Sequence, residues 1–307
     1  MLRAAGLKAY ALKVVDRERN VFDPALLSLD QFDDTIVDLV SNGQDLLLDP
    51  GEKMCAFKQL SWHHALAGAM RQSPNGPGLV STPDLDHLLN TTLRIGQVTI
   101  QPGGAITGLL LVKMTGQEAL RWRQFALRND EEELKKEFDR ELSGLVPQGA
   151  NAHVTGFAGL DAPDAELVAT VTLGGSLGAP TAKRLMLPGF LFESRSIEPF
   201  VKEEKRQEPI DMRYGGKVTE QITYHLPEGM TVEGAPADAV ESWGTHARFV
   251  VRTVPSPGQI VVARQVERAP SVIQADQYQD LRGFYQKIAT SDQQQLVLRA
   301  AQERTGQ

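Results

Sequence analysis

The sequence predicts an α+β protein in which a strand-rich N-terminal part is followed by a mixed segment and then a mainly β region. Three observations predict this class. Asn42-Gly43 separates two apolar runs, which is a strong hairpin signal. Apolar residues recur at helical spacing between 117 and 145, and short strand-like runs punctuated by Gly and Pro follow from 152 to 266. The spacing of these runs indicates a mainly antiparallel β-sandwich with added helices.

The first elements are short. Leu2–Ala5 is composed of good helix formers and Gly6 suits the left-handed residue that ends a helix, so this segment predicts a last helical turn. A chain that opens on the end of a helix is expected to begin inside a domain. Residues 9–15 predict a strand, and residues 32–40 and 44–48 predict the two arms of the hairpin.

A connector is expected from Glu52 to Gly78, because Asp49-Pro50-Gly51 ends the preceding strand and Pro74-Asn75-Gly76-Pro77-Gly78 breaks regular structure. A hairpin follows in residues 93–100 and 106–114 around Pro102-Gly103-Gly104. We therefore divide the chain into residues 1–75 and a β-rich region of residues 76–307, in which a break near residue 200 would separate two subdomains.

Three helices are predicted in the β-rich region, together with a polar helical tail at the end of the chain. Helical spacing of apolar residues predicts them in the ranges 117–127, 131–145 and 278–289. The acidic run from Asp130 to Glu133 suits the start of the second helix, where the dipole is positive. The predicted strands of this region are 152–157, 166–173, 217–225, 245–254 and 259–266.

Composition excludes several classes of protein. The net charge of -7 argues against a nucleic-acid partner, because no basic footprint offsets it. No apolar run approaches the ~20 residues of a membrane span, and residues 1–6 are not followed by the apolar core of a secretory signal. One cysteine, Cys55, excludes an internal disulfide framework. Localisation, substrate and oligomeric state are left undetermined.

Candidate chemical groups each have an ordinary interpretation. Cys55 with His63-His64 invites a metal or nucleophile hypothesis, but adjacent histidines point to different sides and no further Cys or His lies at ligand spacing. A structural cysteine and ordinary histidines are therefore favoured over either site. The Gly-rich segment 174–178 lacks the spacing of a phosphate loop, and no nucleophile elbow is present, so no cofactor and no metal is predicted.

Three linked motifs carry a resemblance to the transglutaminase-like superfamily, a papain-related group. They are Leu2-Arg3-Ala4-Ala5-Gly6-Leu7-Lys8-Ala9, Gln31-Phe32-Asp33-Asp34-Thr35-Ile36-Val37 and Leu47-Leu48-Asp49-Pro50-Gly51. Their order and spacing agree with the family, so residues 1–75 resemble the C-terminal portion of such a domain, made of strands of its core sheet. Residues 218–229 and 247–289 also resemble a β-rich domain of unknown function that accompanies this domain in bacterial proteins.

The resemblance implies thiol chemistry on amides, in which a cysteine attacks, a histidine moves the proton and an acid orients the histidine. Asp49 matches the orienting acid. Asp34 occupies the position of the histidine, and the cysteine position lies upstream of Met1. Without the thiol no acyl-enzyme forms, and an aspartate cannot replace an imidazole as a base near pH 7.

Three functions follow as hypotheses. The first is a truncated or degenerate transglutaminase-like protein without catalysis, whose β-rich part binds a protein or peptide partner or acts as a scaffold. The second is part of a cysteine peptidase or protein transamidase whose nucleophile lies upstream of Met1. The third is a carbohydrate- or protein-binding sandwich, which the low aromatic content of 6% disfavours. Relatives are often exported, and a partial domain is expected to leave one face of its sheet uncovered.

Overall fold

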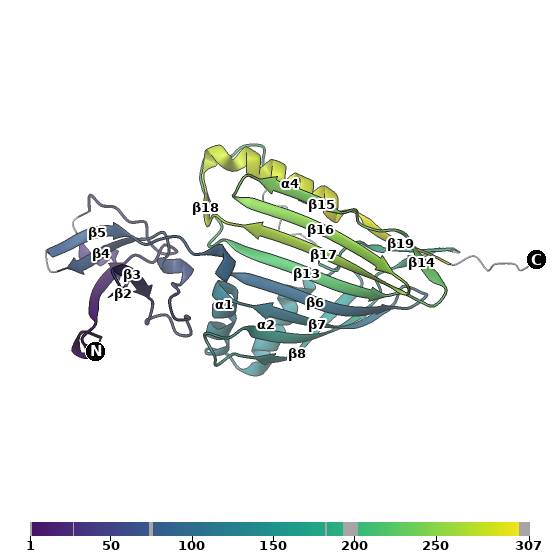
Figure 1. Cartoon of the computed structure of the whole chain (residues 1–307), viewed down its shortest axis with the longest axis horizontal. Coiled ribbons are helices and arrows are strands. Elements are labelled where there is room, and N and C mark those ends of the chain that lie inside the picture. Colours follow the sequence, from purple (N-terminus) through teal and green to yellow (C-terminus); the bar gives the residue numbers. More distant parts are fainter. Residues whose placement is uncertain (1, 27, 74–75, 182, 193–201, 301–307) are drawn as a thin grey trace, which may run out of the picture.

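The computed structural model describes residues 2–26, 28–73, 76–181, 183–192 and 202–300. It is an α+β protein with several antiparallel sheets and one mixed sheet. A small strand-rich part at the N-terminus lies beside one end of a much larger part built on a long twisted sheet (Figure 1). The expected break near residue 200 lies outside the described residues. None of the described helices is long and apolar enough to cross a membrane.

The N-terminal part is a five-stranded antiparallel sheet of order β3-β2-β1-β4-β5. Asn42 and Gly43 join β2 and β3 with φ of 51° and 79°, so the predicted tight hairpin is confirmed. The segment before β1 is a 3-10 helix, and Gly6 after it has φ of 80° as expected for its end. The strands are β1 (Lys8–Val14), β2 (Asp34–Ser41), β3 (Gln44–Leu48), β4 (Gly68–Ser73) and β5 (Gly76–Ser81).

The predicted connector from Glu52 to Gly78 is wrong in its second half. Residues 68–73 form β4, which pairs with β1, and residues 76–81 form β5 at the edge of the sheet. Residues 52–78 contain no β-branched residue and show no clear alternation, and Pro77 argues against a strand except at an edge. Pairing with β1 forms these strands in spite of their weak local propensity. The five-stranded sheet therefore extends to Ser81.

The larger part is built on an eight-stranded sheet of order β15-β16-β17-β13-β6-β7-β9-β8. Its neighbouring strands are antiparallel except β6 and β13, which run parallel with Thr92 opposite Val218. The predicted strands of this region lie at the expected places. The bounds are β6 (Thr91–Ile100), β7 (Ile106–Met114), β8 (Ala150–Ala158), β9 (Leu167–Gly175), β13 (Gly216–His225), β15 (Ala239–Trp243), β16 (Ala247–Ser256) and β17 (Gln259–Arg268).

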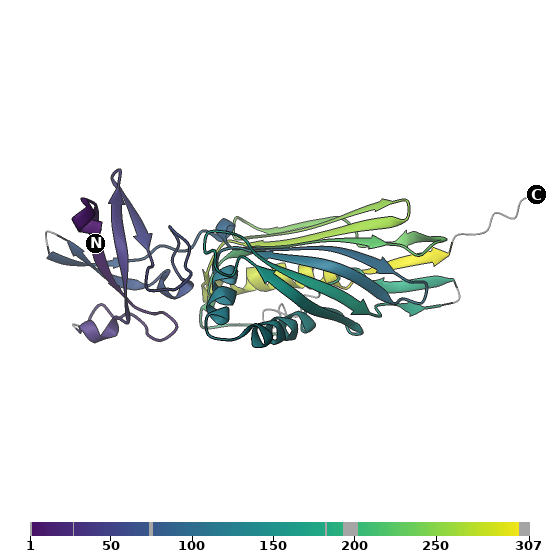
Figure 2. The same cartoon turned by 90° about the horizontal axis from the view of Figure 1, so that it is seen from below.

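One face of this sheet carries the second layer, in which the described residues form the helices α1, α2 and α4 and a four-stranded sheet of order β10-β11-β19-β14 (Figure 2). The expected sandwich is therefore present only in part, because helices occupy much of the layer. Figure 1 places α1 and α2 at the β8 end of the sheet and α4 at the β15 end. The helices are α1 (Gly116–Ala126), α2 (Glu131–Ser143) and α4 (Tyr278–Asp292); the strands are β10 (Ala179–Pro180), β11 (Arg184–Pro188), β14 (Met230–Gly234) and β19 (Gln295–Ala300).

The predicted helical tail is wrong over residues 295–300, because β19 lies inside the four-stranded sheet between β11 and β14, and the rest of the predicted tail lies outside the described residues. Leu296 and Leu298 are fully buried while Gln295 and Arg299 are exposed, so the segment shows the period of a strand. The alternation covers few residues and lies within a polar, helix-favouring context, which hides it. Short elements complete the described chain: β12 (Ile210–Asp211), β18 (Val272–Ile273), η1 (Leu2–Ala5), η2 (Leu29–Gln31), η3 (Trp62–His64), η4 (His87–Leu89) and η6 (Ala275–Gln277).

Hydrogen bonds of the Gln117 side chain join the two parts, and Asn90 fixes the helix start from which Gln117 projects. Asn90 precedes β6, and its Oδ1 accepts from the backbone N–H of Gln117 at 3.0 Å at the start of α1. The buried Gln117 side chain in turn donates to the carbonyl of Leu60 at 2.7 Å and accepts from the backbone N–H of Trp62 at 2.8 Å. Because the Gln117 side chain bonds both to Leu60 and to Trp62, residues 60–62 are held against the first turn of α1.

Candidate functional site

The structure brings the two predicted site residues, Asp34 and Asp49, to the same histidine. Asp34 begins β2 and Asp49 follows β3, and both carboxylates reach His64 in η3. His64 Nδ1 lies 2.7 Å from Asp49 Oδ2, and its Nε2 lies 3.2 Å from Asp34 Oδ2. The side chains of His64 and Asp49 are 2% and 1% exposed, whereas that of Asp34 is 48% exposed. The imidazole is therefore held between one buried and one surface carboxylate.

Neighbouring hydrogen bonds fix this arrangement. Ser61 precedes η3, and its backbone N–H donates to Asp49 Oδ2 at 3.0 Å while its hydroxyl accepts from the backbone N–H of His63 at 3.4 Å. On the other side, the hydroxyl of Thr82 donates to the carbonyl of His64 at 2.6 Å. Asp49 therefore accepts from both the backbone and the ring of one short helical turn, which anchors that turn beneath the sheet.

The carboxylates make His64 a cation. Burial alone lowers its pKa, but the hydrogen bond and charge of Asp49, reinforced by those of Asp34, raise the pKa to about 9. A protonated ring donates from both nitrogens, which matches a carboxylate at each. The ring is therefore an imidazolium near neutral pH, and it cannot accept a proton there.

Sequence reasoning treated His63 and His64 as ordinary residues and missed this role. It predicted that adjacent histidines point to different sides, and they do: His63 Nδ1 lies 3.1 Å from Asp16 Oδ1, away from the Asp49 side. The indole of Trp62 stacks on His63 with ring centroids 4.0 Å apart. The available signal was the acidic residues at strand ends, Asp16, Asp34 and Asp49, because those that become buried, Asp16 and Asp49, need a cation or donor.

Cys55 has the environment of a structural cysteine. It is half-buried, and its thiol donates to the carbonyl of Gln59 at 3.4 Å. Burial raises the pKa of the thiol to about 12, and the charges of Asp49 and Glu52 act in the same direction. The thiol is therefore protonated at neutral pH. Within the described part of the chain, no three His, Cys, Asp or Glu side chains form a group suited to a metal ion.

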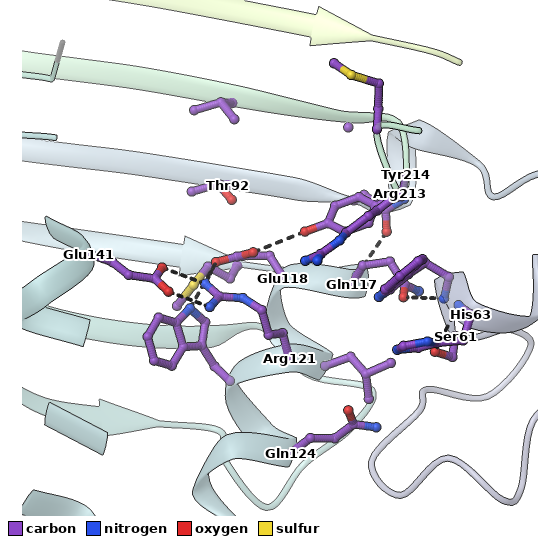
Figure 3. A pocket seen from close by; sticks show the side chains of 18 of the residues that line it. Ser61, His63, Thr92, Gln117, Glu118, Arg121, Gln124, Glu141, Arg213 and Tyr214 are labelled. Carbon is purple, nitrogen blue, oxygen red and sulfur yellow. Dashed lines mark hydrogen bonds and ion pairs between the residues drawn. The ribbon is translucent and has the colours of Figure 1, made fainter. Parts of the chain in front are cut away.

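A cavity of about 820 Å³ lies on the other side of η3, between residues 61–63, the helices α1 and α2, and the end of the large sheet. Figure 3 shows Ser61 and His63 on one side of it and Glu118, Arg121 and Glu141 on another. Arg121 binds Glu118 at 2.6 Å and Glu141 at 2.7 Å, and the hydroxyl of Tyr214 donates to Glu118 at 3.2 Å. Neither Asp34 nor Asp49 lines this cavity.

Comparisons with known proteins give one family and one structural likeness. Residues 183–298 match a family described as a domain of unknown function with a solved structure, DUF3858, which supports the expected β-rich domain of unknown function for that region. No curated protein matches the chain. A solved structure described as a putative protease from Parabacteroides distasonis is similar over 97% of this chain, with a TM-score of 0.48 and 13% identity. This chain spans 41% of the length of that structure.

Proposed function

We propose that this chain is a degenerate transglutaminase-like protein without amide-cleaving or amide-transferring activity, whose β-rich part acts as an interaction module. One observation carries the proposal. The acid that would orient a catalytic imidazole, Asp49, instead binds the buried His64, and the aspartate at the family's histidine position, Asp34, covers the other nitrogen of that ring. Asp34, Asp49 and His64 therefore bind one another in an ionic cluster, in which both ring nitrogens are engaged, instead of forming a proton-transfer site.

Thiol chemistry on amides requires both a general base and a nucleophilic thiol. A general base must be neutral at the working pH and must reach the proton it removes. The pKa of His64 is about 9, so the ring is protonated at neutral pH, and both its nitrogens face carboxylates. A nucleophilic thiol must ionise, and the pKa of Cys55 is about 12. Near neutral pH, His64 therefore cannot act as the base and Cys55 cannot act as the nucleophile.

The test is incorporation of a labelled primary amine into a glutamine-containing protein, with release of ammonia from the same substrate as a second readout. We expect no signal above buffer from the purified chain, and no difference between it and its Cys55→Ser variant. The exposed Ser41→Ala variant serves as a handling control. An amine-incorporation signal that Cys55→Ser abolishes would refute the proposal.

The alternative is that this chain is part of a cysteine peptidase or protein transamidase whose nucleophile lies upstream of Met1. The specific observation in its favour is the 2.7 Å contact between Asp49 and an imidazole, which is the geometry of an orienting acid. A histidine introduced at position 34 would compete with His64 for Asp49. In a longer protein carrying the cysteine, the Asp34→His, His64→Gln double variant should therefore raise activity more than Asp34→His alone. Equal inactivity of both would count against this alternative.

A further inference from the structure

The face of the large sheet that points away from the second layer is uncovered among the residues that the structure describes. Strand β7 shows the two sides: Leu110 and Val112 are buried against the second layer, whereas Leu109 and Leu111 point the other way and are 60% and 40% exposed. Figure 2 shows the helices and the four-stranded sheet on one side only, and Figure 1 shows the N-terminal part beyond one end of the strands. We call the surface that contains Leu109 and Leu111 the open face.

The middle of the open face carries no charge. Two neighbouring rows of side chains cross the strands β17, β13, β6, β7 and β9 there, and each residue lies opposite the next in the register of the sheet. One row is Val261, Thr223, Gln97, Leu109 and Thr172, and the other is Ala263, Gln221, Ile95, Leu111 and Thr170. None of these residues is charged, although 23% of the residues of the whole chain are. Depletion of charge is typical of the core of a protein interface, whereas a surface in water usually mixes both signs.

The same strands place their charges on the covered side. Arg94, Glu220 and Arg264 lie opposite one another on β6, β13 and β17, and their side chains are 14%, 5% and 4% exposed. Glu220 binds Arg94 at 2.7 Å, and Arg264 binds Asp292 of α4 at 2.7 Å. An antiparallel sheet with one face in water usually has the reverse pattern, with its polar residues on the open side. The distribution of charge therefore indicates that the open face is covered in the working protein.

Charged side chains of the open face lie at its flanks. Lys113 pairs with Glu166 at 3.5 Å on the side of β7 and β9, and Arg252 pairs with Asp238 at 3.5 Å on the side of β16. An uncharged centre between charged flanks is the usual anatomy of a protein–protein interface, in which the core is desolvated and the rim stays in water. The open face therefore has the composition of a docking surface for a protein.

The size of the open face matches what a stable dimer needs. Seven of the eight strands have 9 or 10 residues. With about 4.8 Å between strands and about 3.3 Å for each residue, the face measures roughly 38 by 30 Å, or about 1,100 Å². A standard interface takes about 800 Å² from each partner, so contact over about three quarters of the face is sufficient.

A second copy of this chain is complementary to the face. Two sheets that pack face to face keep their strands within about 30° of each other because both are twisted, and a copy brings the same twist. A two-fold axis along the strands, between β6 and β13, lays Leu111 over the partner's Ala263, so a large side chain meets a small one. The same axis lays the charged Arg252 over the partner's Thr170, so no like charges meet there.

We propose that the open face binds the same face of a second copy, so that the protein is a dimer in which the two large sheets pack on each other. The inference goes beyond the proposed absence of catalysis and does not depend on it, because Asp34, Asp49 and His64 belong to the N-terminal part and not to the large sheet. Oligomeric state and amine incorporation are separate measurements, so the failure of one proposal leaves the other standing.

The test is sedimentation equilibrium of the intact chain over a wide range of concentrations. We expect the mass to rise with concentration to twice the 33.6 kDa of one chain. Because the centre of the contact is uncharged, added salt should leave the dissociation constant of the dimer nearly unchanged. A monomer at every concentration would overturn the proposal, and a different partner would then have to cover the open face. A dimer that salt separates would overturn it as well, since such a contact depends on charges.

The matched variants are Leu109→Glu in the middle of the open face and Leu79→Glu on β5 of the N-terminal sheet, where Leu79 is similarly exposed. Leu109→Glu puts a charge into the contact from both copies, so it should weaken the dimer about a hundredfold or more, and Leu79→Glu should leave it unchanged. Gln221→Lys adds a charge to the same face at an exposed polar position, so it decides the question if Leu109→Glu fails to fold. A dimer that survives the open-face charges, or that Leu79→Glu separates, would overturn the proposal.

Discussion

The two parts of this molecule are stabilised internally by different kinds of contact. The larger part has a continuous apolar core that joins the eight-stranded sheet, the helices and the four-stranded sheet, and it includes the aromatic residues Trp122, Phe138 and Phe192. The N-terminal sheet has a core of six small or aliphatic residues, Leu12, Val14, Ile36, Leu60, Ala67 and Ala69. Beside that small core lie the buried charged groups of Asp16, Asp38, Asp49 and His64.

This difference shows how a sheet with little apolar cover can still be stabilised, by ionic contacts of its side chains. One face of the N-terminal sheet is only partly covered: Ala11 and Leu79 are exposed, and Val37 and Leu39 are half-buried. On the other face, Arg71 binds Asp38 and lies 4.9 Å over the ring of Tyr10. The larger part also has buried ionic contacts, such as Arg264 with Asp292 at 2.7 Å, but they lie beside a continuous apolar core, whereas those of the N-terminal sheet lie beside a small one. The N-terminal sheet should therefore respond to pH and charge, and the larger part to packing.

The largest effect is expected from the apolar core. Phe138 is 3% exposed and packs on Trp122 and Phe157 with ring centroids 4.8 and 5.2 Å apart. Phe138→Ala should lower the free energy of unfolding of the larger part by about 3–5 kcal/mol, measured by urea denaturation. The half-buried Phe22 of the N-terminal part is the matched comparison, and Phe22→Ala should cost much less. Equal losses would break the contrast between the two cores.

The next effect is a loss of stability in mild alkali that is confined to the N-terminal part. The pKa of His64 is raised from 6.5 to about 9 on folding, so its contribution is complete below pH 6.5 and disappears as the pH rises to about 9. The change amounts to about 3 kcal/mol, at about 1.4 kcal/mol for each pH unit. The measurement is hydrogen exchange of β1 and β2 amides between pH 6 and 9.5, corrected for intrinsic rates.

His64→Gln is the control for that experiment. It removes the titrating ring but keeps a side-chain amide that can donate to one carboxylate. The difference in stability between the unsubstituted chain and the variant should shrink as the pH rises through 9, because both then lack the cation. A difference that stays constant over this range would show that His64 does not stabilise the sheet through its charge.

Breaking the buried half of the cluster should have a somewhat smaller effect. Asp49→Asn leaves the 1% exposed position occupied but removes the charge that binds His64 at 2.7 Å. We expect a loss of about 1.5–3 kcal/mol, the usual contribution of a hydrogen bond to a charged group. Asp45→Asn, at a 56% exposed position 3.3 Å from Arg71, is the control and should cost less than about 1 kcal/mol. A smaller loss for Asp49→Asn than for Asp45→Asn would contradict the proposed role of the cluster.

Much of the fold follows from local patterns in the sequence. The Asn42-Gly43 hairpin, the helices α1, α2 and α4, and the long strands of the large sheet are all read from turn residues and hydrophobic periodicity. Strands β5, β11, β14 and β15 were not predicted, and β4 and β19 fall where a connector and a helical tail were expected. The pairing partners of β4 and β19 are distant in sequence, and a short segment with weak propensity becomes a strand only through that pairing. Sequence patterns therefore predict elements whose own residues favour that structure, and they miss strands such as β4 and β19 that form only by pairing with distant strands.

The candidate site was predicted only as separate residues. Asp49 and Asp34 were identified by the resemblance of their motifs, but nothing local indicates that His64, 15 and 30 positions away, lies between them. Its position depends on how residues 50–63 fold back over the sheet, and that path is set by Gln117 and Thr82 from other elements. The cavity is equally non-local, because its lining comes from both parts of the chain.

The smallest effect, and the one that sharpens the comparison most, concerns the surface carboxylate. Asp34 is 48% exposed and 3.2 Å from His64, so Asp34→Asn should cost less than about 1 kcal/mol, as for other exposed ion pairs. The pKa of His64, followed by NMR of its ring, should fall yet stay above 6.5, because Asp49 still holds the other nitrogen. A pKa below 6.5 in this variant would mean that the exposed acid, rather than the buried one, keeps the ring charged. In that case an uncharged residue at position 34 would leave a neutral imidazole beside Asp49, and the proposed loss of base catalysis would rest on Asp34 alone.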